Sequence, residues 1–153
     1  MGRRSTSTTR AILLAGLTAG AADILAAFVI YRPATPVQIL QSVGAGLQGT
    51  AAFEGGLVSA GLGLAAHFLI SIAFAGLYLA AAGPAPVLLR RPLLPGLPFG
   101  LFVYGVMNAV VVPLSLAPER PDPSPQMIGL GLAAHALFGL ALAFTAARLA
   151  PRR

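Results

Sequence analysis

Four polar side chains interrupt the long apolar stretches of this sequence, and their types are those that bind protons or metal ions. They are Asp23, His67, Asn108 and His135. Histidine changes its charge near neutral pH, and a polar side chain surrounded by lipid costs enough free energy to need a reason. We call these four residues the polar cluster and treat them as the candidate functional site.

Two copies of one heptapeptide carry the histidines. The sequence Gly-Leu-Gly-Leu-Ala-Ala-His fills residues 61–67 and again residues 129–135, an offset of 68. A weaker echo, Gly-Leu-x-x-Gly, begins at Gly16 and again at Gly96, an offset of 80. We interpret the chain as two copies of a two-helix hairpin, over residues 11–82 and 93–150; chance similarity of helices rich in glycine, alanine and leucine is the alternative. Two spans in each copy give both hairpins the same orientation, with a pseudo-axis along the membrane normal.

The composition sets the fold class. Hydrophobic residues make up 57% of the 153 residues and charged residues 9%, whereas an ordinary soluble domain carries about 25% charged residues. Four apolar stretches, residues 11–31, 57–82, 93–116 and 126–150, are long enough to cross a hydrocarbon core of about 30 Å. They lack the alternation of barrel strands, so we expect helices. The sequence predicts an all-α membrane protein, a single domain over residues 1–153 with four transmembrane helices.

The arginines predict the orientation. Eight lie on one side of the four predicted spans and two on the other, where Glu54, Glu119 and Asp122 also lie. This asymmetry places both termini in the cytoplasm. The basic ends favour contact with anionic lipid headgroups, and we expect no nucleic-acid partner. The first stretch also resembles a signal peptide with a cleavage site at residues 19–21, but its apolar run continues to Tyr31 and favours an uncleaved span.

Small residues and prolines predict how the elements are arranged. Both histidines belong to ladders of small residues with a spacing of four, which places them on helix faces that contact protein. In the first outer connection, Thr35 before Pro36 is a helix start. The residues that follow share one apolar face, so we expect a short helix in the outer interface: Val37, Leu40, Gly44 and Leu47.

Several of these segments carry a family resemblance. Residues 67–78, His-Phe-Leu-Ile-Ser-Ile-Ala-Phe-Ala-Gly-Leu-Tyr, resemble the second-span signature of the YagU-like family of small bacterial inner-membrane proteins. Gly96-Leu97 followed by Pro113-Leu114 is similar to the third-span spacing of that family, and His135 falls where its last span has a histidine. The resemblance implies a four-span protein of the bacterial inner membrane. It implies no established activity, substrate or cofactor.

The polar cluster admits three functions. The side chains can hydrogen-bond one another and fix the register of the bundle, which predicts a structural or accessory membrane component. They can instead serve proton-linked or small-solute transport, which four spans would support as an oligomer. Third, His67 and His135 can be axial ligands of a b-type haem, or bind a metal together with Asp23.

Other sites are limited by what the sequence lacks. There is no cysteine, which excludes disulfides, iron–sulfur clusters and zinc-thiolate sites. There is also no GxSxG, HExxH, P-loop or Rossmann motif, so we expect no enzyme. Glu54 is a candidate for the outer mouth of the bundle, although a solvated carboxylate near a helix start is the simpler interpretation. The expected partners are the lipid bilayer and either further copies of the chain or a larger membrane complex.

Overall fold

The computed structural model describes residues 7–150, and all of the elements described there are helical. Four helical stretches are long and apolar enough to cross a membrane, which confirms an all-α multi-pass membrane protein. These stretches are α1 (Thr8–Ile30), α3 (Gly56–Ala82), α5 (Leu93–Val106) with its π-helical continuation η2 (Met107–Val111), and α6 (Pro125–Leu149). The shorter elements are α2 (Pro36–Gln48), the 3₁₀ turn η1 (Gly49–Phe53) and α4 (Val87–Arg90).

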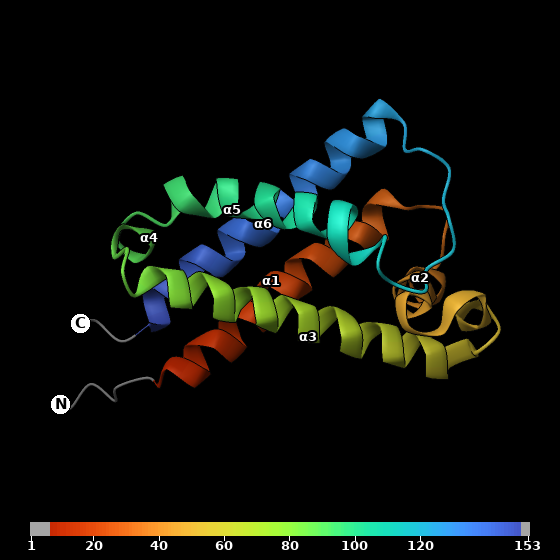
Figure 1. Ribbon diagram of the computed structural model, residues 1–153, viewed down its shortest axis with the longest axis horizontal. Coiled ribbons are helices and arrows are strands. Elements are labelled where there is room, and N and C mark those ends of the chain that lie inside the picture. Colours follow the sequence, from red (N-terminus) through yellow and green to blue (C-terminus); the bar gives the residue numbers. More distant parts are fainter. Residues whose placement is uncertain (1–6, 151–153) are drawn as a thin grey trace.

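Different elements lie at the two ends of the bundle (Figure 1). The start of α1, the end of α6 and α4 lie at one end, which we call the α4 end; α2 and the α5–α6 connection lie at the other, the α2 end. The α4 end carries Arg10, Arg90, Arg91 and Arg148. The orientation prediction also uses Arg3, Arg4, Arg152 and Arg153, which lie outside the described residues.

The outer surface of the spans is apolar. In the most apolar stretch of each span, only 17–28% of the residues are buried inside the protein. Large side chains such as Leu25, Leu69 and Val29 are each more than 60% exposed. A helix that is apolar on all sides needs an apolar surrounding, which for a single chain of this size is the lipid bilayer.

Glycines set the crossing of both hairpins. Four contacts define these crossings: Gly16 with Ile72 and Gly20 with Phe68 between α1 and α3, and Gly96 with Leu140 and Gly100 with Ala136 between α5 and α6. Adding the offset of 80 to the α1 residue numbers and the offset of 68 to the α3 residue numbers of the first two contacts gives the residues of the last two. Both hairpins therefore cross in the same register, because glycine lets two helix backbones approach closely.

The packing between the hairpins departs from a two-fold arrangement. Extensive contacts join α1 to α6, where Ala15 and Ala19 meet the core residues of α6. A pseudo-axis along the membrane normal would exchange α1 with α5 and α3 with α6, so α3 would pack on α5 as α1 packs on α6. Within residues 7–150, however, α3 and α5 hardly touch. They meet through Phe99 of α5, whose ring centroid lies 5.0 Å from that of Tyr78 and 6.5 Å from that of Phe74. The contacts instead run in the order α3, α1, α6, α5 (Figure 1).

The predicted third span is too long. We expected residues 93–116, but the helical stretch ends at Val111, whereas the other three spans start and end within three residues of their predicted bounds. Pro113 explains the difference, because proline has no N–H and its ring clashes with the carbonyl four residues earlier. Ahead of it the helix widens into the π turn η2, in which the Val112 N–H donates to the Met107 carbonyl at 2.8 Å.

The predicted helix in the first outer connection is present as α2. The Thr35 hydroxyl caps it, and the Thr35 N–H donates to the Gln38 side-chain oxygen at 2.8 Å, which completes a capping box. On its predicted apolar face, Leu47 is 60% exposed and Gly44 is buried. Gly44 faces α3, where it lies against Gly63. Two glycines let the helix axes approach closely, and this contact decides which face is buried.

Polar contacts fasten α2 at the end of the bundle. The buried Gln41 side chain donates to the Gly56 carbonyl at 3.2 Å, and Ser59 donates to the Gln48 side chain at 2.8 Å. From the α5–α6 connection, the Leu116 N–H donates to the Gly46 carbonyl at 3.0 Å. These bonds hold α2 against both α3 and the connection that follows α5.

Candidate functional site

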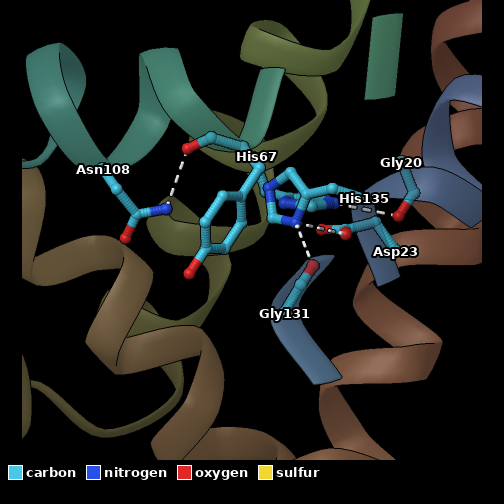
Figure 2. Close-up of polar contacts among 7 residues, drawn as sticks. Gly20, Asp23, His67, Asn108, Gly131 and His135 are labelled. Atoms are coloured by element: carbon cyan, nitrogen blue, oxygen red, sulfur yellow. Dashed lines mark hydrogen bonds and ion pairs between the residues drawn. The ribbon is translucent and has the colours of Figure 1, made fainter. Parts of the chain in front are cut away.

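His67 joins α3 to α1. Its Nε2 lies 2.9 Å from the carbonyl oxygen of Gly20 (Figure 2). A carbonyl only accepts, so Nε2 carries the proton and donates. The contact forms because Gly20 has no side chain: a Cβ there would meet Phe68 and the Ser71 hydroxyl. The glycine that permits the helix crossing thus also exposes the carbonyl that the histidine reaches.

His135 of α6 faces α1 one helical turn further along. Its Nδ1 lies 3.0 Å from the Gly131 carbonyl of its own helix and 3.8 Å from the Asp23 carboxylate (Figure 2). The first distance is a hydrogen bond; the second is longer than one but within ion-pair range. The side chains of His135 and Asp23 are 21% and 19% exposed. Gly20 and Asp23 lie three residues apart on one face of α1. The two histidines therefore contact neighbouring positions of this helix.

Tyr104 adds a wall that the sequence interpretation did not assign to the site. Its ring stands edge-on to the His135 ring, with centroids 5.2 Å apart. The ring lies against Gly131, where a Cβ would come within 2.9 Å of it. Position 104 follows Gly96 and Gly100 at a spacing of four, which is the available signal that it faces α6.

Asn108 and Glu54 lie apart from this group. The Asn108 side chain is exposed and donates to the Tyr104 carbonyl of its own helix at 2.9 Å, and Figure 2 shows it set away from Asp23 and His135. Its predicted place in the polar cluster is therefore wrong. Glu54 is exposed at the α2 end, between η1 and α3. The structure brings together Asp23 and His135, with His67 one turn away.

The described residues do not assemble the predicted three-ligand metal site. Within residues 7–150, no three His, Cys, Asp or Glu side chains gather closely enough to hold a metal ion. The predicted set of Asp23, His67 and His135 is not assembled, because His67 turns its Nε2 towards Gly20.

Comparisons with known proteins add no assignment. No protein-family model, no curated protein and no solved structure matches this chain.

Proposed function

We propose that this chain is a structural or accessory component of a bacterial inner membrane, without enzymatic activity, in which two repeat-related histidines brace helix α1. The proposal rests on one observation: the side chains of His67 on α3 and His135 on α6 contact positions one turn apart on α1. This helix thereby gains a polar contact with each hairpin.

The satisfaction of polar groups supports a bracing role. Among the described residues, no buried side-chain nitrogen or oxygen lacks a hydrogen-bond partner. Polar groups that are fully paired inside a membrane protein act as links between helices, each worth on average about 0.6 kcal/mol and at most about 1.7 kcal/mol. The matched crossings of the two hairpins support their origin by duplication, as a part of the same proposal.

The proposed location rests on charge and resemblance. The α4 end of the bundle carries arginines without acidic residues among the described positions, which supports its placement in the cytoplasm. Membership of the YagU-like family, proposed from the segment around residues 67–78, supports the bacterial inner membrane. The exposed Leu47 side chain and the exposed N-terminus of α2 support an interfacial position for α2.

Bracing by His67 is tested with a substitution that keeps the ring. We expect His67→Phe to lower the free energy of unfolding in detergent by about 0.6 to 1.7 kcal/mol, because the donor to Gly20 is lost while the volume is kept. Asn108→Leu is the matched control, since this exposed amide bonds only within its own helix, and we expect no measurable change. Equal unfolding energies for the two variants would contradict the bracing role.

Proton-linked or small-solute transport by an oligomer is the second candidate. It is favoured by the spacing of Asp23 and His135, which lie 3.8 Å apart on different helices and are each about one-fifth exposed. Carboxylates and imidazoles are the side chains that bind and release protons in membrane transporters, and neither of these two is fully buried within the chain.

Flux measurements separate the two candidates. If the chain carries protons, we expect Asp23→Asn to abolish the flux into liposomes that enclose a pH-sensitive dye, because the amide cannot bind the proton. Glu54→Gln is the matched control, an identical change at an exposed position of the α2 end, and it should conserve the flux. A proton flux that persists in the Asp23→Asn variant would contradict the transport function. Absence of flux in the wild-type protein would favour the bracing function.

A further inference from the structure

The short helix α4 folds back against the end of the bundle. The buried Tyr78 side chain of α3 donates a hydrogen bond to the Leu88 carbonyl of α4 at 2.8 Å. Leu88 and Leu89 pack against the core, which includes Leu142 and Ala146 of α6. A helix of four residues is too short to be stable by itself. Its contacts with α3 and α6 therefore hold α4 in place.

Tyr78 sets the depth of α4 in the membrane. Helix α3 has 27 residues, so it is about 40 Å long. This length matches a bilayer with its headgroup layers, about 40–45 Å, of which the hydrocarbon core takes about 30 Å. Tyr78 lies one turn before Ala82, the last residue of α3, which is about 6 Å from the helix end. The Leu88 carbonyl that it binds therefore lies where the hydrocarbon meets the headgroups, and α4 lies in the headgroup layer.

Two arginines without a partner in the described part of the protein end this helix. Arg90 is the last residue of α4 and Arg91 is its C-cap, and both are exposed. Within residues 7–150 their guanidinium groups take part in no hydrogen bond or ion pair, whereas at the α2 end the Arg120 side chain donates to the Ser42 carbonyl at 3.4 Å. None of the acidic residues lies at the α4 end, where Arg148 adds a further positive charge (Figure 1). This surface therefore attracts an anion.

The surface around these arginines is apolar. Val87, Leu93 and Leu94, which flank Arg90 and Arg91 in the sequence, are each more than 50% exposed. Guanidinium groups form paired, charge-assisted hydrogen bonds with phosphate oxygens. A water-soluble anion such as inorganic phosphate would leave the apolar side chains uncovered. A phospholipid carries a phosphate next to acyl chains, so it matches both the charged and the apolar part of the surface.

We propose that α4 is a binding site for an anionic phospholipid, in which Arg90 and Arg91 bind the headgroup phosphate and Val87 contacts the adjoining part of an acyl chain. Tyr78 is the positioning residue, because it holds α4 at the depth of the headgroups. The site lies outside the polar cluster and involves neither His67 nor His135, so it is independent of the bracing of α1.

Lipid titration of the full-length protein in a non-ionic detergent, followed by native mass spectrometry, tests the proposal. We expect phosphatidylglycerol to bind with saturation, and phosphatidylcholine, which has no net charge, to bind about tenfold more weakly or less. The double variant Arg90→Gln/Arg91→Gln should lower the affinity for phosphatidylglycerol about 25-fold, or about fivefold for each arginine. Arg32→Gln/Arg120→Gln removes the same charge from the other connections and should leave the affinity unchanged.

A third variant separates position from charge. Tyr78→Phe keeps every arginine and the ring but removes the hydrogen bond to Leu88, so we expect it to weaken the binding of phosphatidylglycerol as well. Equal losses in the two double variants would show attraction by net charge alone and overturn the proposal, as would equal binding of the two lipids. Complete competition by inorganic phosphate would assign the arginines to a soluble anion instead. An unchanged affinity in Tyr78→Phe would contradict a site held in place by α3.

Discussion

Replacement of Gly139 by alanine is expected to destabilise the protein by at least about 3 kcal/mol, the upper range for overpacking of a core. A Cβ at this position would overlap the Gly96 carbonyl and lie 2.7 Å from the Gly100 Cα. Both neighbours are backbone atoms, which cannot rotate away as a side chain can. The α5–α6 hairpin must therefore open, and Tyr104 and His135 would lose their relative positions.

A second glycine of α6 provides the control. Gly129 has no atom within 4 Å of its would-be Cβ, and alanine favours a helix over glycine by about 1 kcal/mol. We expect Gly129→Ala to unfold at the same denaturant concentration as the wild type or at a higher one. Unfolding in detergent followed by circular dichroism makes the comparison. A Gly139→Ala protein as stable as Gly129→Ala would show that the hairpins do not cross at this glycine.

The spans were predictable because their signal is spread over many residues. Each of the four long apolar stretches is recognisable in the sequence even where its helix is locally irregular. The start of α2 is predicted by two adjacent residues, Thr35 and Pro36. Close contacts depend on single positions. In the repeated heptapeptide, Gly61 and Gly129 face open space, whereas Gly63 lies under α2 and Gly131 under the Tyr104 ring. The sequence of the heptapeptide does not indicate which of its glycines makes a close contact or which element that glycine contacts.

The candidate site was predictable only where the helices are regular. Asp23, His67 and His135 stand on uninterrupted α-helix, and the four-residue spacing placed the two histidines on protein-facing sides. Asn108 was assigned by the same spacing, but it lies in the π turn η2. A π turn interrupts the regular helical repeat, and in it the Asn108 side chain donates back to the Tyr104 carbonyl of its own helix. Pro113 is the sequence signal for this irregularity, because a proline disturbs the helical turn that precedes it.

Replacement of Gly63 by alanine is expected to release α2 from the bundle. A Cβ there would overlap the Leu40 carbonyl and lie 2.8 Å from the Gly44 nitrogen. As the clash falls between α2 and α3 alone, the contacts of α3 with α1 persist and the four spans stay folded. We expect amide hydrogen exchange in residues 36–48 to accelerate by an order of magnitude or more, since a loss of about 1.4 kcal/mol already gives a tenfold change.

The matched control lies two residues earlier in the same heptapeptide. Gly61 has nothing within 4 Å of its would-be Cβ, so Gly61→Ala should leave exchange in α2 unchanged. Equal protection of α2 in both variants would show that Gln41, Gln48 and the Leu116 amide hold it without the glycine crossing. Loss of protection throughout the spans would instead make α2 part of the cooperative core. Gly131, the repeat counterpart of Gly63, contacts a tyrosine ring and not a helix; the two copies of one heptapeptide therefore hold different elements, α2 in the first hairpin and the wall beside His135 in the second.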